Sequence, residues 1–175
     1  DEWEFLLLDK ENIYNKIDPY LQEFIKVHGY YDLFIIDADH AHVVYTARKE
    51  NDLGETLEAG SLKNSGLASL WRKVVKQEEF AIEDFSFYGP SKEPACFVGI
   101  PVFDHNNKVA AVLALQLNVE EINSVMQNKT GMGNTGESYL IGKDKFMRSE
   151  SRFEDNTLLV RKVDTFAVTE VFDGR

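Results

Sequence analysis

The sequence predicts an α+β fold in which an antiparallel sheet is flanked by helices and preceded by a long N-terminal helix. Three observations lead to this prediction. Residues 3–27 have apolar side chains at helical spacing. Four apolar runs rich in strand-forming residues follow residue 29, joined in pairs by short polar turns. One amphipathic helix, from Ser65 to Gln77, separates the two pairs, an order typical of helices packed beside an antiparallel sheet.

The two pairs of predicted strands are the centre of this fold. The first pair covers residues 31–37 and 42–47. The second covers residues 95–103 and 108–117, and its turn contains Asn106-Asn107, which tolerates the positive φ angles of a tight hairpin. Residues 109–115 are apolar throughout, which indicates a central strand covered on both faces. A short helix is expected over residues 120–127.

The sequence changes character after Lys129. Residues 130–136 form a glycine-rich linker, residues 137–142 a predicted strand, and residues 159–167 a last amphipathic helix. We therefore divide the chain into an N-terminal helical segment (1–28), a sheet-containing module (29–127) and a glycine-rich joint with a hairpin and helix (128–175). We expect this last part to begin a second, truncated module.

Composition excludes several partners. The formal net charge of −11, from 19 basic and 30 acidic side chains, repels nucleic acids and anionic lipid surfaces. Cys96 is the only cysteine, so neither an internal disulfide nor a thiolate zinc site can form. No run approaches the roughly 20 apolar residues of a membrane span. We expect any membrane anchor to lie outside this sequence.

Gly131, Gly133 and Gly136 match the spacing of the dinucleotide-binding fingerprint. That fingerprint works when a strand precedes it and a helix follows, because the helix N-terminus receives the pyrophosphate. Here the predicted order is reversed. We therefore expect no nucleotide cofactor.

The first hairpin turn gathers four polar residues: Asp37, Asp39, His40 and His42. A metal site needs several ligands that converge on one point, and the glycine and glutamate of an EF-hand are missing. A solvated turn is the favoured interpretation. Because no paired nucleophile and base is visible either, we expect no enzyme activity, no metal and no other cofactor.

The unusual feature is the density of aromatic residues between the predicted helix and sheet. Small-molecule pockets are concave, lined by aromatic side chains and fixed by a few polar groups. Aromatic side chains also fill ordinary cores, and that alternative stays open for each of them. We expect a ligand site formed by Tyr45, Trp71, Phe85, Tyr88 and Phe97, with Arg72, Asp84 and Ser91 as its polar groups.

Several segments resemble, in order, the motifs of a Cache-type (PAS-like) sensor domain. They are residues 29–37, 44–46, 52–54, 84–85, 88–91, 99–102 and 112–117. The most specific segment covers residues 133–144 and 147–152. It is similar to a segment in the periplasmic regions of methyl-accepting chemotaxis proteins, of some sensor histidine kinases and of membrane cyclases. The resemblance covers roughly residues 20–172.

The resemblance implies a PAS-like sheet that holds a small ligand, a long helix that leaves the membrane, and a homodimer in the full receptor. We accordingly expect the periplasmic, ligand-sensing domain of a bacterial inner-membrane chemoreceptor. Two alternatives stay open: the same domain on a histidine kinase or cyclase, and a ligand-free structural or dimerisation module. Family members that bind amino acids place an Arg-x-Trp pair at the pocket. Trp71-Arg72 stands in another order, which argues against an amino-acid ligand.

Overall fold

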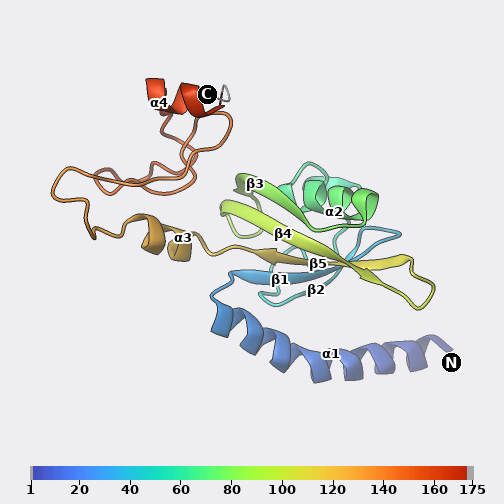
Figure 1. Ribbon diagram of the computed structural model, residues 1–175. Helices are drawn as coiled ribbons and strands as arrows, with labels where there is room; N and C mark the ends of the chain where they lie inside the picture. The colour runs from blue at the N-terminus through green and yellow to red at the C-terminus, as the bar shows by residue number, and fades with distance from the viewer. Residues whose placement is uncertain (1, 173–175) are drawn as a thin grey trace.

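The computed structural model describes the backbone of residues 2–172 and the side chains of residues 14–172. Its centre is a five-stranded antiparallel sheet with the strand order β2-β1-β5-β4-β3 (Figure 1). The strands are β1 (Asp32–Asp37), β2 (Val43–Thr46), β3 (Ala81–Tyr88), β4 (Glu93–Phe103) and β5 (Val109–Gln116). The predicted α+β fold is confirmed, and β5 is the central strand, as its apolar run predicted.

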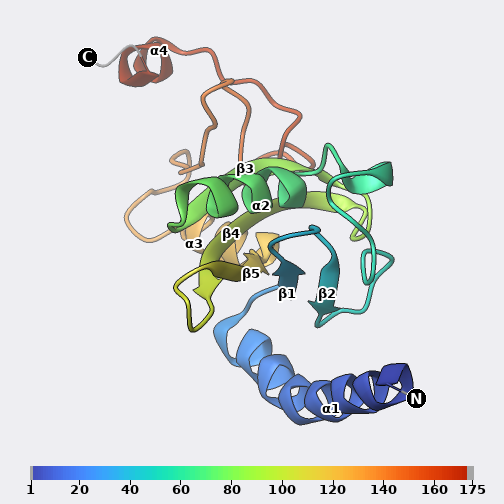
Figure 2. The ribbon, with the colours of Figure 1, turned by 90° about the vertical axis from the view of Figure 1, so that its right-hand side faces the viewer.

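Helices lie on both faces of this sheet. Figure 2 shows α1 (Glu2–His28) beneath one face and α2 (Gly66–Gln77) across the other. The 3-10 turn η1 (Gly60–Leu62), α3 (Val119–Met126) and α4 (Phe166–Phe172) are shorter. Within the described residues, no helix combines the length and the apolar character needed to cross a membrane.

The N-terminal helical segment differs in one respect from expectation. Pro19 lies inside α1, where the sequence predicted the start of a second helix. The helix ends as predicted at Gly29, which adopts a φ of 71° that favours glycine. That α1 is the long helix by which a receptor leaves its membrane stays a prediction. Residues 1 and 173–175, at the ends of the predicted first and last segments, lie outside the described residues.

The pleat of β1 separates two apolar cores. Successive side chains of a strand point to opposite faces, so Phe34 and Ile36 pack with α2, while Leu33 packs with Ile25 of α1. The larger core lies on the α2 side and contains the rings of Phe34, Tyr88 and Phe97, whose edges meet at centroid distances of 5.1–6.5 Å. The face of the sheet that a residue occupies therefore decides which of the two cores it joins.

Helix α2 lies close to the sheet because two glycines leave room for it. A Cβ on Gly66, in the first turn of α2, would lie 3.3 Å from the Phe97 ring, and one on Gly99 of β4 would lie 2.9 Å from Leu70. Ser65 caps the helix by accepting a hydrogen bond from the backbone N–H of Ala68 at 3.1 Å. The predicted helix from Ser65 to Gln77 is confirmed.

The sequence did not place β3. Residues 81–88 form the edge strand next to β4, whereas only the loop around Tyr88 was predicted there. Glu83 and Asp84 are disfavoured in strands, and the large apolar side chains of Ile82 and Phe87 are exposed. Its hydrophobic pattern is therefore not that of a half-buried strand.

Two predictions for residues 128–175 are wrong. Residues 137–142 form no strand, and the hairpin is held by isolated bridges such as Ile141 to Met147. The last helix begins at Phe166 and not near Leu159, because Leu159 adopts a left-handed φ of 60° that interrupts a helix. Gly131 and Gly133 do adopt the positive φ angles that a glycine-rich linker supplies.

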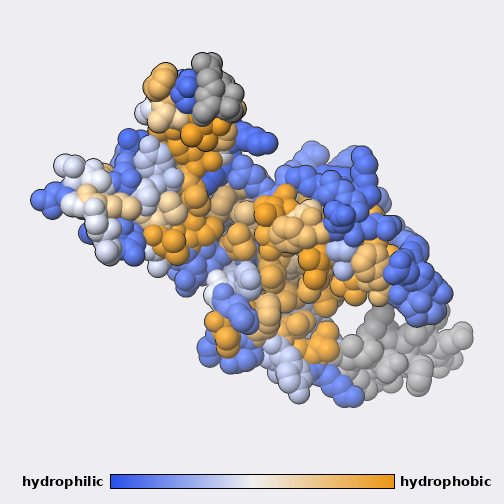
Figure 3. Space-filling view, in the orientation of Figure 1, coloured by the Kyte–Doolittle hydropathy of each residue, from blue (hydrophilic) through white to orange (hydrophobic). Residues whose placement is uncertain are grey.

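Apolar contacts join this C-terminal segment to the sheet. Phe85 of β3 and Cys96 of β4 form one buried cluster with Leu158, and Ile122 of α3 packs against it. Figure 3 shows apolar side chains gathered where the sheet and the segment meet. The segment is therefore packed against the sheet in addition to its chain connection through α3.

Arg148 adds a polar tie at the same junction. Its Nε and Nη2 atoms each donate to the Asp84 carboxylate at 2.9 Å, and Nη2 also donates to Asp144 at 2.9 Å. The Arg148 side chain is 8% exposed. A Cβ on Gly142 would overlap its guanidinium group, so glycine is required there. This bidentate geometry suits arginine and excludes lysine.

We expect Arg148→Met to lower the free energy of unfolding by about 1–3 kcal/mol, because it removes charge-assisted hydrogen bonds but leaves both carboxylates free to meet water. Arg161→Met is the matched control. Its exposed ion pair with Glu154, at 3.1 Å, should contribute less than about 1 kcal/mol. Urea denaturation measures both variants, and equal losses would contradict the role of Arg148 as a tie.

Candidate functional site

A cluster of polar side chains is buried on the α2 side of the sheet, at the end where β1 begins and β5 ends. We call it the polar cluster, and its members are Asp32, Thr46, Glu50, Asp52, Tyr88, Ser91 and Gln116. Asp32, Thr46, Asp52, Tyr88 and Gln116 are at most 2% exposed. Each of these polar groups lost its hydration on folding. A group of buried polar side chains is therefore expected only where structure or binding requires it.

Asp32 fixes the start of β1 to the end of β2. Its Oδ1 atom accepts hydrogen bonds from the backbone N–H groups of Leu33, Ala47 and Arg48, at 2.7, 2.9 and 3.0 Å. Its Oδ2 atom accepts from the Thr46 hydroxyl at 2.6 Å. Four donors thus surround one buried carboxyl group and set the direction in which the chain leaves β2.

Asp52 lies on the loop that follows. Its Oδ2 atom accepts a hydrogen bond from the Tyr88 hydroxyl at 2.8 Å, which ties this loop to the end of β3. Its Oδ1 atom is buried and has no hydrogen-bond partner. Since buried polar atoms are nearly always paired, this free oxygen marks a place where a donor is missing.

Two further acceptor oxygens are buried without a hydrogen-bond partner. Glu50 accepts from the Tyr31 hydroxyl at 2.9 Å through Oε1, while its Oε2 atom is buried without a partner. Gln116 donates to the Ser91 hydroxyl at 3.4 Å, a long hydrogen bond, and its Oε1 atom is likewise unpaired. The three unpaired atoms are all oxygens that accept hydrogen bonds.

The polar cluster carries an excess of negative charge. Burial, with a smaller contribution from the neighbouring carboxylate of Asp52, raises the pKa of Asp32 to about 6. Burial also raises the pKa of Asp52, with a smaller contribution from the charge of Glu50. The hydroxyl of Tyr88 stays protonated, because burial and the Asp52 charge both raise its pKa. The arrangement therefore favours a ligand that brings donors or positive charge.

Two cavities lie beside the polar cluster. The first, which we call the loop cavity, has a volume of about 450 Å³ and is lined by Asn51, Ser61, Leu62, Asn64, Ser65, Phe87, Gly89 and Pro90. The second, of about 170 Å³, is bounded by Tyr31, Arg48, Glu93 and Gln116 among others. The loop cavity has the size of a small-ligand pocket.

A larger hollow, of about 600 Å³, lies under α1 and is bounded by Tyr14, Ile17, Tyr45 and Leu53. Its described lining is largely apolar. No described residue with an unpaired oxygen lines this hollow or the loop cavity, whereas Gln116 bounds the cavity of about 170 Å³. Volume alone favours this hollow, but specificity needs a few converging polar groups. We therefore take the polar cluster with the loop cavity as the candidate site.

The structure distributes the eight predicted site residues over five places. Tyr88 and Ser91 belong to the polar cluster, and Trp71 and Phe97 lie in the adjoining core. Tyr45 lies on the opposite face, where its hydroxyl donates to Asp18 of α1 at 2.9 Å.

The remaining predicted residues have other partners. Arg72 is exposed and donates to the Lys63 carbonyl at 3.2 Å. Asp84 accepts from Arg148, and Phe85 packs toward the C-terminal segment. The eight residues are therefore not gathered around one cavity.

Asp32, Glu50, Asp52 and Gln116 were not among the predicted site residues. Two of them carried a sequence signal. Asp32 and Gln116 interrupt the apolar runs of β1 and β5 at corresponding ends, and they are partners in the strand register. A polar residue inside a buried strand is more informative than an aromatic one, since burial costs it hydration.

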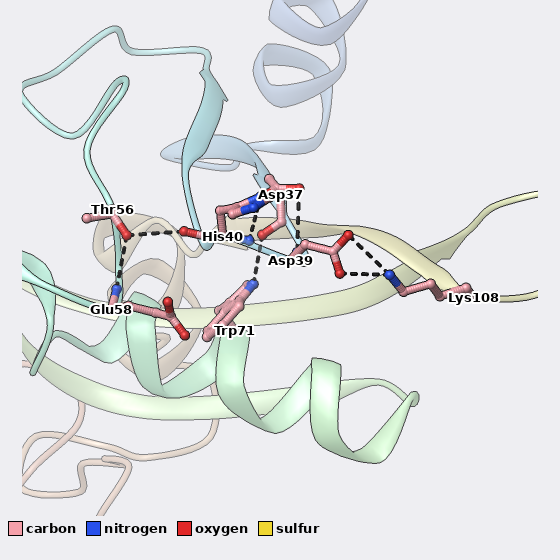
Figure 4. A network of polar contacts seen from close by, with 7 residues as sticks. All are labelled: Asp37, Asp39, His40, Thr56, Glu58, Trp71 and Lys108. Atoms are coloured by element: carbon pink, nitrogen blue, oxygen red, sulfur yellow. Dashed lines mark hydrogen bonds and ion pairs between the residues drawn. The ribbon is translucent and has the colours of Figure 1, made fainter.

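The polar turn between β1 and β2 is a structural turn (Figure 4). The Asp37 carboxylate accepts from the His40 backbone N–H at 2.6 Å, and Lys108 donates to Asp39 at 2.8 Å. Trp71 of α2 donates its indole N–H to the Asp37 carbonyl at 3.1 Å, so the turn rests on the helix. Among the described side chains, those of residues 14–172, no group of three or more His, Cys, Asp or Glu is placed to hold a metal ion.

An antiparallel sheet of this strand order between helices is a PAS-like fold. No family model and no curated protein matches the chain. Solved structures do match. The sensor domain of the histidine kinase DctB from V. cholerae has a TM-score of 0.62 at 13% identity, over 97% of this chain and 59% of that one.

Two chemoreceptor domains share the fold as well. The ligand-binding domain of Tlp3 from Campylobacter jejuni, solved with L-valine, has a TM-score of 0.64 at 13% identity, over 94% of this chain and 61% of that one. That of PctC from Pseudomonas aeruginosa, in complex with GABA, has a TM-score of 0.57 at 10% identity, over 83% and 60%. The chain thus spans about three fifths of these neighbours. The predicted resemblance to Cache-type sensors is confirmed for the fold.

Ionisation of Asp32 makes a testable contribution to stability. Burial raises its pKa from the ordinary value of 3.8 to about 6, so the folded state binds more protons than the unfolded state between these values. The free energy of unfolding that Asp32 contributes is therefore fully present below about pH 4. It declines by up to about 3 kcal/mol as the pH rises to about 6.

We expect Asp32→Asn to remove this dependence. The free energy of unfolding of the wild type relative to the variant should fall between about pH 4 and 6 and stay constant above, as measured by chemical denaturation. Asp39→Asn is the control with the opposite sign, because Lys108 lowers the pKa of Asp39. A relative stability that rises with pH for Asp32 would show that its four donors outweigh burial.

Proposed function

We propose that this chain is the ligand-sensing domain of a bacterial transmembrane chemoreceptor, situated outside the cytoplasm, and that it is not an enzyme. The observation that carries the proposal is the polar cluster beside the loop cavity, with three buried acceptor oxygens that lack donors. A bound molecule would supply those donors. Tlp3 and PctC, which share the fold, were solved with small molecules bound, and this supports the same use here.

Direct contacts offer a route from the site to α1. The loop that carries Glu50 and Asp52 begins at Ala47, whose carbonyl accepts a hydrogen bond from Gln22 of α1 at 2.6 Å. Lys49 on the same loop pairs with Asp18 of α1 at 3.5 Å. A ligand that binds one position of this loop more tightly than another would therefore shift α1 relative to the sheet.

The proposed organisation follows from this route. Residues 29–127 would form the sensing module, residues 1–28 would carry the signal toward the membrane, and residues 128–175 would join a further module. In the full receptor we propose a homodimer whose membrane anchors lie outside this sequence. The small molecule is the proposed partner, and nucleic acids are not.

The same sensor on a histidine kinase is a second candidate, because the V. cholerae DctB sensor domain shares the fold over nearly the whole chain. The structure of the sensing module is compatible with either output. A ligand-free structural module is the third alternative, and the unpaired oxygens argue against it.

A thermal-shift screen tests ligand binding. We expect at least one compound among small amines, organic acids, amino acids and sugars to raise the melting temperature, because binding only the folded state stabilises it by mass action. At a hundredfold excess over the dissociation constant the gain is about 2.7 kcal/mol, or roughly 5–10 °C. A cooperatively folded domain whose melting temperature no compound moves would favour the ligand-free module.

A further inference from the structure

The smaller of the two cavities beside the polar cluster is bounded by a residue with an unpaired oxygen. We call it the Gln116 cavity, and it lies where β5 passes into α3 (Figure 1). Strand ends, the residue after β2 and the start of α3 form its lining: Tyr31, Arg48, Glu93, Pro94, Gln116, Leu117, Asn118, Val119 and Glu120. Its volume of about 170 Å³ exceeds what one water needs and falls below the roughly 300–1,000 Å³ of a pocket for a drug-sized ligand. A molecule of a few heavy atoms fits this space.

Gln116 is the buried polar residue of the Gln116 cavity. It is 2% exposed, and its Oε1 atom has no hydrogen-bond partner. Its Nε2 atom makes only the long hydrogen bond of 3.4 Å to Ser91. Because a buried amide is costly when it is left unpaired, Gln116 needs a donor that the described residues do not supply.

Tyr31 brings a cation to the same cavity. Its backbone N–H donates to the Gln116 carbonyl at 2.9 Å, and its own carbonyl accepts from Arg48 Nε at 2.9 Å. The Arg48 guanidinium lies 4.4 Å from the centre of the Tyr31 ring. Among the described residues, the two Nη atoms of Arg48 have no hydrogen-bond partner. Arg48 therefore offers donors to the cavity that Gln116 bounds.

Two carboxylates complete the charged lining. Glu93 lies at the start of β4, and Glu120 lies in the first turn of α3. One guanidinium therefore stands against two carboxylates, and the other lining residues are uncharged. The lining presents three acceptor side chains, Gln116 included, and its donors come mainly from Arg48.

Hydrogen-bond capacity narrows the class of ligand. A carboxylate would pair with Arg48 but would bring only further acceptors to Gln116 and Glu93. An ammonium or amidinium ion would supply donors, but it would repel Arg48 and leave it without an acceptor. A hydroxyl group has a single donor for three acceptor side chains. A primary amide carries two N–H donors and a carbonyl acceptor on one planar group and adds no charge.

We propose that the Gln116 cavity binds a small neutral primary amide, whose NH₂ group donates to Gln116 and Glu93 and whose carbonyl accepts from Arg48. The terminal torsion of a glutamine side chain is soft, so Gln116 turns its amide toward the ligand without a change in β5. The bound amide joins Arg48, after β2, to the strand that leads into α3. This inference rests on the proposed function and names a ligand class for it.

Four probes of equal size test the ligand class on the whole 175-residue domain. Acetamide, acetate, acetamidinium and 2-propanol share one shape and differ in their donors, acceptors and charge. Because ligands this small bind weakly, NMR spectroscopy of the isotope-labelled domain follows each titration over the millimolar range. We expect acetamide to bind at least tenfold more tightly than each of the others and to shift the side-chain amide signals of Gln116. A smaller preference, or a preference for another probe, would overturn the amide assignment.

Variants locate the binding site. Gln116→Met keeps an unbranched side chain but removes the amide, and should weaken acetamide at least tenfold. Gln77→Met, at the exposed end of α2, is the matched control and should change affinity less than twofold. Equal affinities of both variants, or acetamide shifts confined to the loop cavity, would overturn the site. Because the selectivity among the four probes is measured on the wild type, the inference is tested even if Gln116→Met does not fold.

The outcomes for the ligand class and for sensing are distinct. If none of the four probes binds while the thermal-shift screen yields a compound, the amide assignment is wrong and ligand sensing stands. If neither the probes nor any compound of the screen binds the folded domain, both proposals fail.

Discussion

Burial of the Asp32 carboxyl group is the constraint on which the rest of this structure depends. Burial without partners would cost several kcal/mol. Four donors, from Leu33, Thr46, Ala47 and Arg48, offset that cost, and in doing so they fix the end of β2 against the start of β1. The chain therefore leaves β2 in one direction, and the loop that follows carries Glu50 and Asp52 over the end of the sheet.

The same anchor relates the two faces of the sheet. Ala47 donates its N–H to Asp32 on the α2 side and accepts at its carbonyl from Gln22 of α1. One residue thus connects the polar cluster to the helix that would carry a signal. On the far side of the cluster, Asp52 is held to β3 by Tyr88, and Gln116 reaches Ser91. A bound molecule could donate hydrogen bonds to the loop after β2 and to β5. Its binding could therefore change the positions of both elements.

Much of the fold could be predicted from the sequence, because period-two and helical patterns report directly which side chains are buried. The strands β1, β2, β4 and β5 and the helix α2 carry clear patterns. The edge strand β3 does not, since Ile82 and Phe87 face solvent and Glu83 and Asp84 interrupt it. The site was less predictable. Tyr88 and Ser91 were named, but aromatic density also selected Tyr45 and Phe85, which enter different cores. The partners of a buried polar atom depend on strand register and loop path, which pattern alone does not specify.

The central claim is that the polar cluster is a binding site and not merely a structural network. A crystal structure of the domain with a compound from the thermal-shift screen tests it most directly. The account predicts a donor atom of that compound within about 2.7–3.2 Å of Asp52 Oδ1 or Gln116 Oε1. A compound seated instead in the hollow under α1, between Tyr14 and Leu53, with Asp52 and Gln116 paired only to ordered water, would contradict it.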